Sequence, residues 1–451
     1  MAPTSDFGRK FAELTWVFLI LSCPTLAAAE PPQNKPATVR EWVSGASDSL
    51  VENYRWFHTN PELSFQEEHT ASQLAELLAA EGYQVTPGIG GHGLVALLNN
   101  GDGPTIMFRT DLDALPVTEN TELVYASQKK VTLADGTTSG VMHACGHDIH
   151  MTNALGVARY MAHHKDQWQG TLMILGQPAE EKGAGAKAML EDGLFERFPK
   201  PDYALALHVD PTMPVGTVGF RAGYAMANVD SVDIILKGKG GHGAYPHMTV
   251  DPIVQAAQLV MDLQTIVSRE IAPSEPAVVT VGAIHGGTKH NVIGESCHLQ
   301  LTVRSYGEET RKQLLDAIRR KANAVAESYR AEKPEITVKE GTPSLFNDQK
   351  LTGSVVETLR RTLGDDHVVP VDPSMGGEDF SRYGLAGVPI FMFRLGAVDA
   401  RRLARYEQLG QKPPSLHSPL FYPDAEEALQ TSVTASVAAL LDLFGNKTDQ
   451  P

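Results

Sequence analysis

The stretch that decides the fold reads Thr171-Leu172-Met173-Ile174-Leu175-Gly176-Gln177-Pro178, and the pair Glu180-Glu181 comes shortly after it. Its apolar run is short and nearly continuous, as in a strand that is buried on both faces. Helical patterns, clearest at 39–57 and 67–81, alternate with further runs of this kind at 93–98, 105–108, 203–208 and 388–393. Buried strands separated by helices predict an α/β fold, with a mostly parallel sheet and helices on both faces.

Polar residues stand where these predicted strands end. Glu180 and Glu181 follow the strand at 171–175, Asp111 follows the strand at 105–108, and His208 closes the strand at 203–208. Ligands of open α/β sheets bind at the carboxyl ends of the strands. We therefore expect these side chains to converge, although they are far apart in the sequence.

Residues 222–340 break the pattern. Strands are predicted at 229–237, 277–284, 296–305 and 335–339, and helices at 251–268 and 308–330. The order β-α-β-β-α-β is typical of a ferredoxin-like domain. Because a strand of the first kind returns at 388–393, this domain is predicted to be an insertion. The first domain then occupies 38–221 and 341–446, and a short tail occupies 447–451.

The first residues, 1–29, have the pattern of an export signal. A basic start precedes a largely apolar run at 16–21, and small residues at 27–29 form a cleavage site. The apolar run is too short for an ordinary transmembrane helix. Residues 20–23 weakly resemble a lipoprotein acceptor box, so lipid anchoring is a minor alternative. We expect an exported protein, periplasmic or secreted, with a linker at 30–37 and no stable membrane insertion.

Size and charge exclude some classes of protein. A chain of 451 residues is too long for one ordinary core, so two or more domains are expected. The formal charge is 38 − 54 = −16. Because no basic surplus exists to meet phosphates, a nucleic-acid partner is not expected.

A cluster of possible metal ligands lies in Met142-His143-Ala144-Cys145-Gly146-His147-Asp148. Loop-type residues precede it and helical spacing follows it, so it stands at a loop-to-helix junction where Asp148 can cap free N–H groups. Thiolate and imidazole together suit a borderline-soft metal such as zinc. The structural alternative is a buried cysteine beside capping residues.

The chain offers five candidate metal ligands: Cys145, His147, Glu181, His208 and His417. Each alone has an ordinary structural explanation, but each follows an apolar strand or lies in a loop marked by glycine or proline. The adjacent pair Glu180-Glu181 allows one carboxylate to bind metal while its neighbour stays free as a base. Asp111 could orient a ligand imidazole through its second nitrogen.

The predicted insertion contributes further polar candidates. Residues 238–247 form a glycine-rich loop that contains His242. Phosphate binding is the obvious alternative, but the loop is neither a Walker loop nor the dinucleotide fingerprint. Asn291 and Arg304 could meet a carboxylate.

Taken together, several segments resemble the M20 metallopeptidases, in particular the aminoacylase and amidohydrolase subgroup. That subgroup contains hippurate hydrolases, N-acyl-amino-acid amidohydrolases and plant auxin-conjugate hydrolases. The matching segments are 108–116, 143–148, 177–181, 206–208, 240–246, 291–293 and 376–380, in family order. Arg109, where other branches have a histidine, favours this subgroup. His290 departs from the apolar or aromatic residue expected, and Glu378 matches without an assigned role.

The resemblance implies two divalent metal ions per subunit, zinc or manganese first and cobalt or nickel next, with Cys145 between them. It implies that His147, Glu181, His208 and His417 complete the ligand set and that Glu180 is the general base. The inserted domain would cover the site and form a homodimer. His242 would reach the partner subunit's site to stabilise the oxyanion, while Asn291 and Arg304 would hold the substrate carboxylate.

The function expected is hydrolysis of the amide bond of N-acyl amino acids, by a metal-bridging hydroxide with Glu180 moving the proton. A dipeptidase or carboxypeptidase of the same family is the nearest alternative. Two further alternatives are a thiol amidase, with Cys145 as nucleophile beside His147 or His208, and a non-catalytic binding protein. The preferred acyl group and amino acid stay open.

Overall fold

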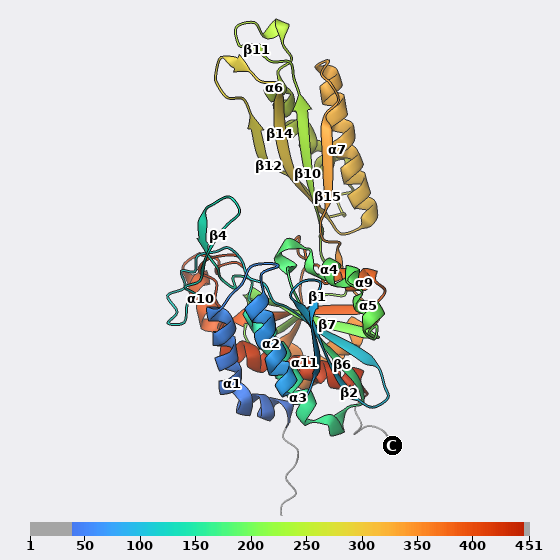
Figure 1. Cartoon of the computed structure of the whole chain (residues 1–451). Coiled ribbons are helices and arrows are strands. Elements are labelled where there is room, and N and C mark those ends of the chain that lie inside the picture. The colour runs from blue at the N-terminus through green and yellow to red at the C-terminus, as the bar shows by residue number, and fades with distance from the viewer. Residues whose placement is uncertain (1–37, 446–451) are drawn as a thin grey trace, which may run out of the picture. The chain divides into compact units, whose positions relative to one another are not determined.

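The computed structural model describes residues 38–445 (Figure 1). The predicted export signal, linker and tail, at 1–29, 30–37 and 447–451, lie outside the described residues. Within the described range, no helix combines the length and the apolar character needed to cross a membrane.

The larger sheet has eight strands in the order β1-β2-β6-β3-β7-β18-β8-β17. Their bounds are Gln84–Ile89 for β1, Gly93–Asn100 for β2, Gly170–Gln177 for β6, Thr105–Asp111 for β3, Tyr203–Pro214 for β7, Ile390–Val398 for β18, Val218–Phe220 for β8 and Val368–Pro370 for β17. The four central strands β6, β3, β7 and β18 are parallel. All five predicted strands are present, but β2 pairs antiparallel with β6, so the sheet is mixed at its edges.

Alternate residues of β6 enter two separate cores. Leu172 and Ile174 pack in the core on one face of the sheet, whereas Met173 and Leu175 pack in the core on the other face. Because both faces are buried, the strand needs apolar residues at successive positions, which explains its continuous apolar run. The prediction of helices on both faces is confirmed.

The helices divide between these two faces (Figure 1). The first core contains residues of α1 (Val39–Thr59), α2 (Glu68–Ala80), α3 (His147–His163), α8 (Gln349–Leu363) and α11 (Ala425–Leu443). The second contains residues of α4 (Gly185–Glu191), α5 (Leu194–Arg197) and α9 (Ser381–Leu385). The predicted helices at 39–57 and 67–81 correspond to α1 and α2.

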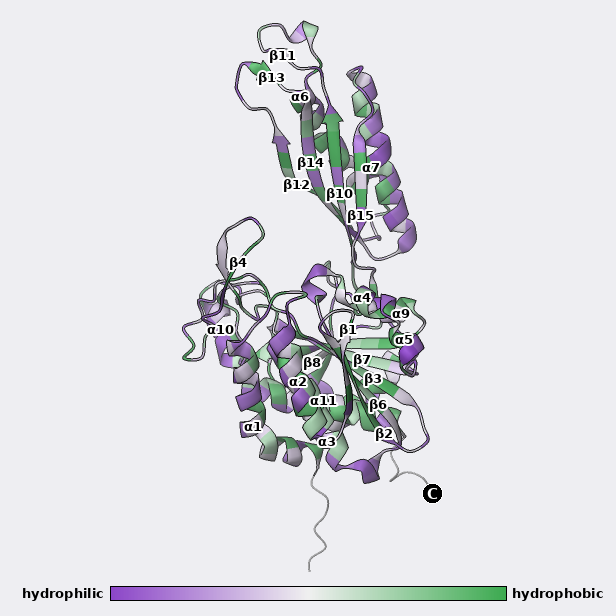
Figure 2. Cartoon of the chain, viewed as in Figure 1, coloured by the Kyte–Doolittle hydropathy of each residue, from purple (hydrophilic) through white to green (hydrophobic). Residues whose placement is uncertain are grey.

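A second sheet has four antiparallel strands in the order β12-β14-β10-β15. Its strands are β10 (Asn228–Lys237), β12 (Ala277–Gly286), β14 (Ser296–Ser305) and β15 (Glu335–Glu340), and its helices are α6 (Pro252–Thr265) and α7 (Glu308–Ser328). This strand order is that of the ferredoxin-like fold, so the predicted fold class is confirmed. The helix predicted to reach 268 changes to a π-helical turn at Ile266–Glu270. Figure 2 shows much hydrophilic surface on α7.

Short strand pairs complete the fold. They are β4 (Lys130–Thr132) with β5 (Thr138–Gly140), β9 (Gly223–Met226) with β16 (Leu345–Asn347), and β11 (Gly241–His242) with β13 (Val292–Ile293). Because β9 precedes β10 and β16 follows β15, the two chain segments that connect the sheets pair with each other. Helix α10 (Ala400–Gln408) lies in the segment after β18.

Candidate metal centre

The structure brings the five candidate ligands together. The Sγ atom of Cys145 lies 3.5 Å from Nε2 of His208. The carboxylate of Glu181 lies 3.9 Å from Nε2 of His147 and 3.5 Å from Nε2 of His417. Ligand atoms lie within 4.8 Å of one another in two sets, Cys145-His147-His208 and Cys145-Glu181-His417. Cys145 is common to both sets, so its sulfur lies between two possible metal positions.

Gly146 allows Cys145 and His147 to lie on either side of a tight turn. It has φ +75° and stands immediately before α3. A Cβ atom at this position would lie 2.6 Å from Cγ2 of Val209 in β7. Glycine is therefore required by both the left-handed backbone and the close approach to the strand that carries His208.

Two other positions in the site have a left-handed backbone without being glycine. Ala179, directly before the glutamate pair, has φ 50°, and His417 has φ 67°. Such conformations are uncommon for residues with a Cβ and are kept where surrounding contacts require them. Here the backbone N–H of Ala179 donates to Glu67 at 2.7 Å, and that of His417 donates to the Ala144 carbonyl at 2.9 Å.

The imidazole rings of the two buried candidate ligands are oriented by backbone carbonyls. Nδ1 of His147 donates to the Asp113 carbonyl at 2.8 Å, and Nδ1 of His208 donates to the Val209 carbonyl at 2.8 Å. In each ring Nε2 is then the nitrogen left for a metal.

A divalent metal fits the residues present. Nε2 of His147 and Oε1 of Glu181 are buried and have no hydrogen-bond partner among the described residues. Buried polar atoms are normally paired, so both atoms point to a missing partner. A thiolate, three imidazoles and a carboxylate form a donor set that suits zinc and related divalent ions.

Asp111 has a different partner from the one predicted. It accepts a hydrogen bond from Nδ1 of His150 at 2.7 Å and another from Nη1 of Arg109 at 2.8 Å. The nitrogen of His147 nearest to it is Nε2, at 3.5 Å, and the second nitrogen is held by Asp113 instead. His150 was not predicted from the sequence, although it follows His147 by three residues, a spacing that places both on one helix face.

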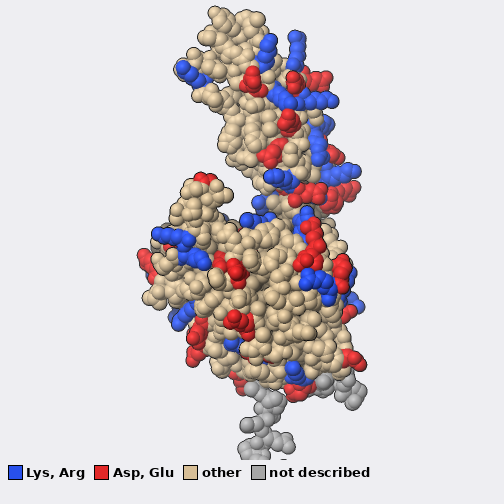
Figure 3. Space-filling view, viewed as in Figure 1, with Lys and Arg blue, Asp and Glu red and all other residues tan. Residues whose placement is uncertain are grey.

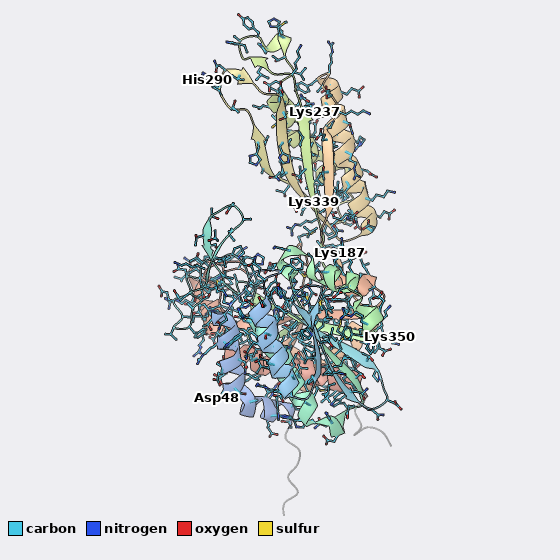
Figure 4. The ribbon with its side chains drawn as sticks, viewed as in Figure 1. Asp48, Lys187, Lys237, His290, Lys339 and Lys350 are labelled. Atoms are coloured by element: carbon cyan, nitrogen blue, oxygen red, sulfur yellow. The ribbon has the colours of Figure 1, made fainter. Side chains whose placement is uncertain are left out.

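The polar candidates between residues 222 and 340 separate into two groups. Arg304 lines a cavity of about 590 Å³, together with Cys145, Glu180, Glu181, His208 and His417. His242 and Asn291 do not line it. Both are exposed beside the β11–β13 pair, where the N–H of Gly243 donates to the Asn291 carbonyl at 2.9 Å. His290 is exposed in the loop before β13 (Figure 4).

A family model described as peptidase family M20/M25/M40 matches residues 107–408. The chain belongs to this family. The resemblance inferred from its segments is thereby confirmed, as is its assignment to metal-dependent hydrolases that act on amide or peptide bonds.

Relatives of this M20 chain cover most of its length. It is 38% identical to N-acetyl-L-cysteine deacetylase of Bacillus subtilis over 345 residues, which is 76% of this chain and 79% of that one. It is 35% identical to thermostable carboxypeptidase 1 of Saccharolobus solfataricus over 404 residues, 89% of this chain and 96% of that one. A Bacillus subtilis structure described as a dinuclear metal binding peptidase from the M20 family matches with TM-score 0.73 and 31% identity, covering 89% of this chain and 99% of that one.

In the M20 chain, Glu180 lies beside a buried network of charged groups. Its carboxylate lies within 4.8 Å of the carboxylates of Glu378 and Asp379. These two accept hydrogen bonds from Nη2 of Arg109, at 2.8 and 3.3 Å. Burial first, and the Glu378 carboxylate next, raise the pKa of Glu180 well above its usual range. A cation nearby favours the charged form, so the carboxylate is suited to exchange a proton beside bound metal.

The surroundings of Cys145 do not favour a nucleophilic thiol. Burial, and next the Glu181 carboxylate, raise the pKa of Cys145 well above its usual range. Burial, and next the neighbouring His150, hold the pKa of His208 well below its usual range, so His208 is not a cationic partner. For His147, burial is outweighed by the Asp111 carboxylate and its neighbours, which raise its pKa to about 10, yet the Cys145 thiol keeps its raised pKa beside this cation. Reactive cysteines need a lowered pKa, whereas a metal ion deprotonates a coordinating thiol outright. The protein environment favours Cys145 as a metal ligand.

Proposed function

We propose that this M20 chain hydrolyses the amide bond of N-acyl amino acids with two divalent metal ions, zinc or manganese, held by Cys145, His147, Glu181, His208 and His417. One observation carries the proposal. The Cys145 sulfur belongs both to the ligand set with His147 and His208 and to the ligand set with Glu181 and His417. The name of the Bacillus subtilis deacetylase relative supports an N-acyl amino acid as substrate.

The chain's own residues supply positioning and proton transfer. Bound divalent metal ions would polarise the scissile carbonyl and stabilise developing negative charge. Glu180 would take a proton from the attacking water and pass it to the leaving amine. Arg304 would hold the substrate carboxylate, since it lines the cavity and its guanidinium is fixed by donation to the Met375 carbonyl at 2.7 Å.

Chelation distinguishes this proposal from a thiol amidase. Treating the protein with a chelator is expected to lower hydrolysis of N-acetyl-leucine by about 10³-fold or more, because Lewis-acid stabilisation is lost. Added zinc or manganese should restore it, and liberated leucine measures the rate. An enzyme that keeps its rate in chelator, but loses it to an alkylating reagent, would identify Cys145 as the nucleophile.

The carboxypeptidase relative favours a second candidate, cleavage of dipeptides or of the last residue of a peptide. Both reactions place a free carboxylate next to the amide, so the cavity alone does not separate them. The same assay with Leu-Leu and N-acetyl-leucine does. We expect N-acetyl-leucine to have a higher kcat/KM than Leu-Leu.

We also propose that the insertion at 222–340 forms a homodimer through α6 and the edge strand β12. Helix α6 exposes Ile253, Val254 and Met261, and β12 exposes Ile284. An apolar surface beside an unpaired strand edge is suited to pairing with a second copy. Charged side chains are instead interspersed along the side of α7 (Figure 3).

Mixed dimers test whether His242 serves the partner subunit's site. His242→Ala and Glu180→Gln should each be inactive alone. Mixed after dissociation, they should recover about a quarter of wild-type activity, because half of the random dimers are mixed and one of their two sites is intact. No recovery in a mixture shown to exchange subunits would place His242 outside the partner subunit's site.

A further inference from the structure

Arg394 is a cation that lines the cavity of the candidate metal centre without an assigned role. It is partly exposed, in β18 of the larger sheet. Among the described residues, its guanidinium makes no hydrogen bond and no ion pair within 4.0 Å. A guanidinium with five N–H donors is normally bonded when it is removed from bulk water.

The strand register places Arg394 beside a metal ligand. In the parallel pairing of β18 with β7, Arg394 is the direct partner of His208. Their neighbours Phe393 and Leu207 enter the first core, while Met392 and Ala206 enter the second. Because side chains alternate along a strand, Arg394 and His208 project from the same face of the sheet, side by side.

Arg109 is a structural arginine on the same face of the sheet, and its contacts can be compared with those of Arg394. Its guanidinium donates to Asp111, Glu378 and Asp379, and its Nε donates to Gln177. No carboxylate is placed in this way for Arg394. Burial lowers the pKa of Arg394 from its ordinary value, and the Asp210 and Glu378 carboxylates, which make no hydrogen bond to it, offset only part of this effect.

The other cations of the cavity are already bonded to the protein. Nζ of Lys182 donates to the Ser64 carbonyl at 3.2 Å. Arg304 donates to the Met375 carbonyl and to Oγ1 of Thr302. Arg394 is therefore the cavity cation with the most free donors, and a planar guanidinium matches a carboxylate in a two-point contact.

We propose that Arg394 binds a second carboxylate of the substrate, so that the cavity selects N-acyl amino acids with two negative charges. This inference rests on the proposed function, in which Arg304 holds the carboxylate next to the scissile amide. The second carboxylate comes either from the side chain of an acidic amino acid or from a dicarboxylic acyl group. The shared chemistry is two carboxylates in one cavity, each recognised by a separate arginine.

Three substrates and three variants test the proposal. The substrates are N-acetyl-leucine, N-acetyl-glutamate and N-succinyl-leucine, and the variants are Arg394→Met, Arg394→Lys and Arg401→Met. Methionine keeps much of the side-chain volume without the charge, and lysine keeps the charge without the two-point contact. Arg401 is a matched control because its side chain is 92% exposed and does not line the cavity.

The wild type should prefer one of the two dianionic substrates over N-acetyl-leucine. For that substrate, Arg394→Met should lower kcat/KM by about 30-fold, mainly through KM, while N-acetyl-leucine should change by less than about 3-fold. Arg394→Lys should recover part of the loss, and Arg401→Met should change nothing. A loss with N-acetyl-glutamate assigns the second carboxylate to the amino acid, and a loss with N-succinyl-leucine assigns it to the acyl group.

Two results would overturn the inference. One is an equal loss on all three substrates, which would mean that Arg394 acts on the metal site or on folding. The other is no loss on any substrate. Thermal unfolding adds a second readout: an unpaired cation predicts that Arg394→Met unfolds at the wild-type temperature or above, whereas a structural arginine predicts a lower one. If the wild type hydrolyses none of the three, the proposed function fails instead.

Discussion

Glu180→Gln is expected to abolish turnover while the metal ions stay bound. Glutamine keeps the size and the hydrogen-bonding oxygen of Glu180 but cannot exchange a proton. Loss of a general base costs about 10²- to 10⁴-fold in kcat. Glu180 is 8% exposed and lies beside the ligand pair His147 and Glu181 without belonging to either set that contains Cys145. The measurements are kcat for N-acetyl-leucine and the metal content of the purified variant.

Glu181→Gln is the matched control, since it makes the same change one residue away. Glu181 belongs to the set with Cys145 and His417, so this variant should lose metal as well as activity. A Glu180→Gln enzyme that keeps wild-type kcat would show that another group moves the proton. Equal loss of metal from the Glu180→Gln and Glu181→Gln variants would show that Glu180 binds metal and is not a free base.

Cys145→Ala should lose both metal and activity. Its sulfur is the atom common to the two ligand sets, so its removal weakens both metal positions at once. Metal ions contribute several kcal/mol to transition-state stabilisation, so loss of the site corresponds to about 10³-fold or more in rate. Elemental analysis and the N-acetyl-leucine assay measure the two effects.

Cys297→Ala provides the control for Cys145→Ala. Cys297 is the other free cysteine among the described residues, and it packs in the hydrophobic core of the second sheet. Its replacement should lower stability by about 1–2 kcal/mol and leave the metal content unchanged. A Cys145→Ala protein that holds the wild-type amount of metal would refute the bridging position of the sulfur.

Local patterns were sufficient to predict the central strands and the ferredoxin-like order. The apolar runs at 171–175 and 203–208 are long enough to mark buried strands, and the polar residues after them mark the edge where ligands converge. The alternation in β10 and β14 marks strands with one buried face. These features depend on neighbours in sequence, so they can be seen without coordinates.

Features that depend on packing could not be predicted in this way. Helix α11 is buried over most of its length and contains Ser432, Thr434 and Ser436, so it has no apolar stripe of the ordinary kind. The partner of Asp111 was misjudged because strand and helix geometry decide which histidine it meets. Arg394 was not predicted as a site residue, because only the register of β18 against β7 shows that it lies beside His208.

The metal content of the purified wild-type protein tests the central claim most directly. A cluster in which Cys145 joins two ligand sets predicts about two equivalents of divalent metal per chain, removed by a chelator together with the activity on N-acetyl-leucine. One equivalent would contradict the shared position of the sulfur. A fully active protein that holds no divalent metal would contradict the whole assignment of the site.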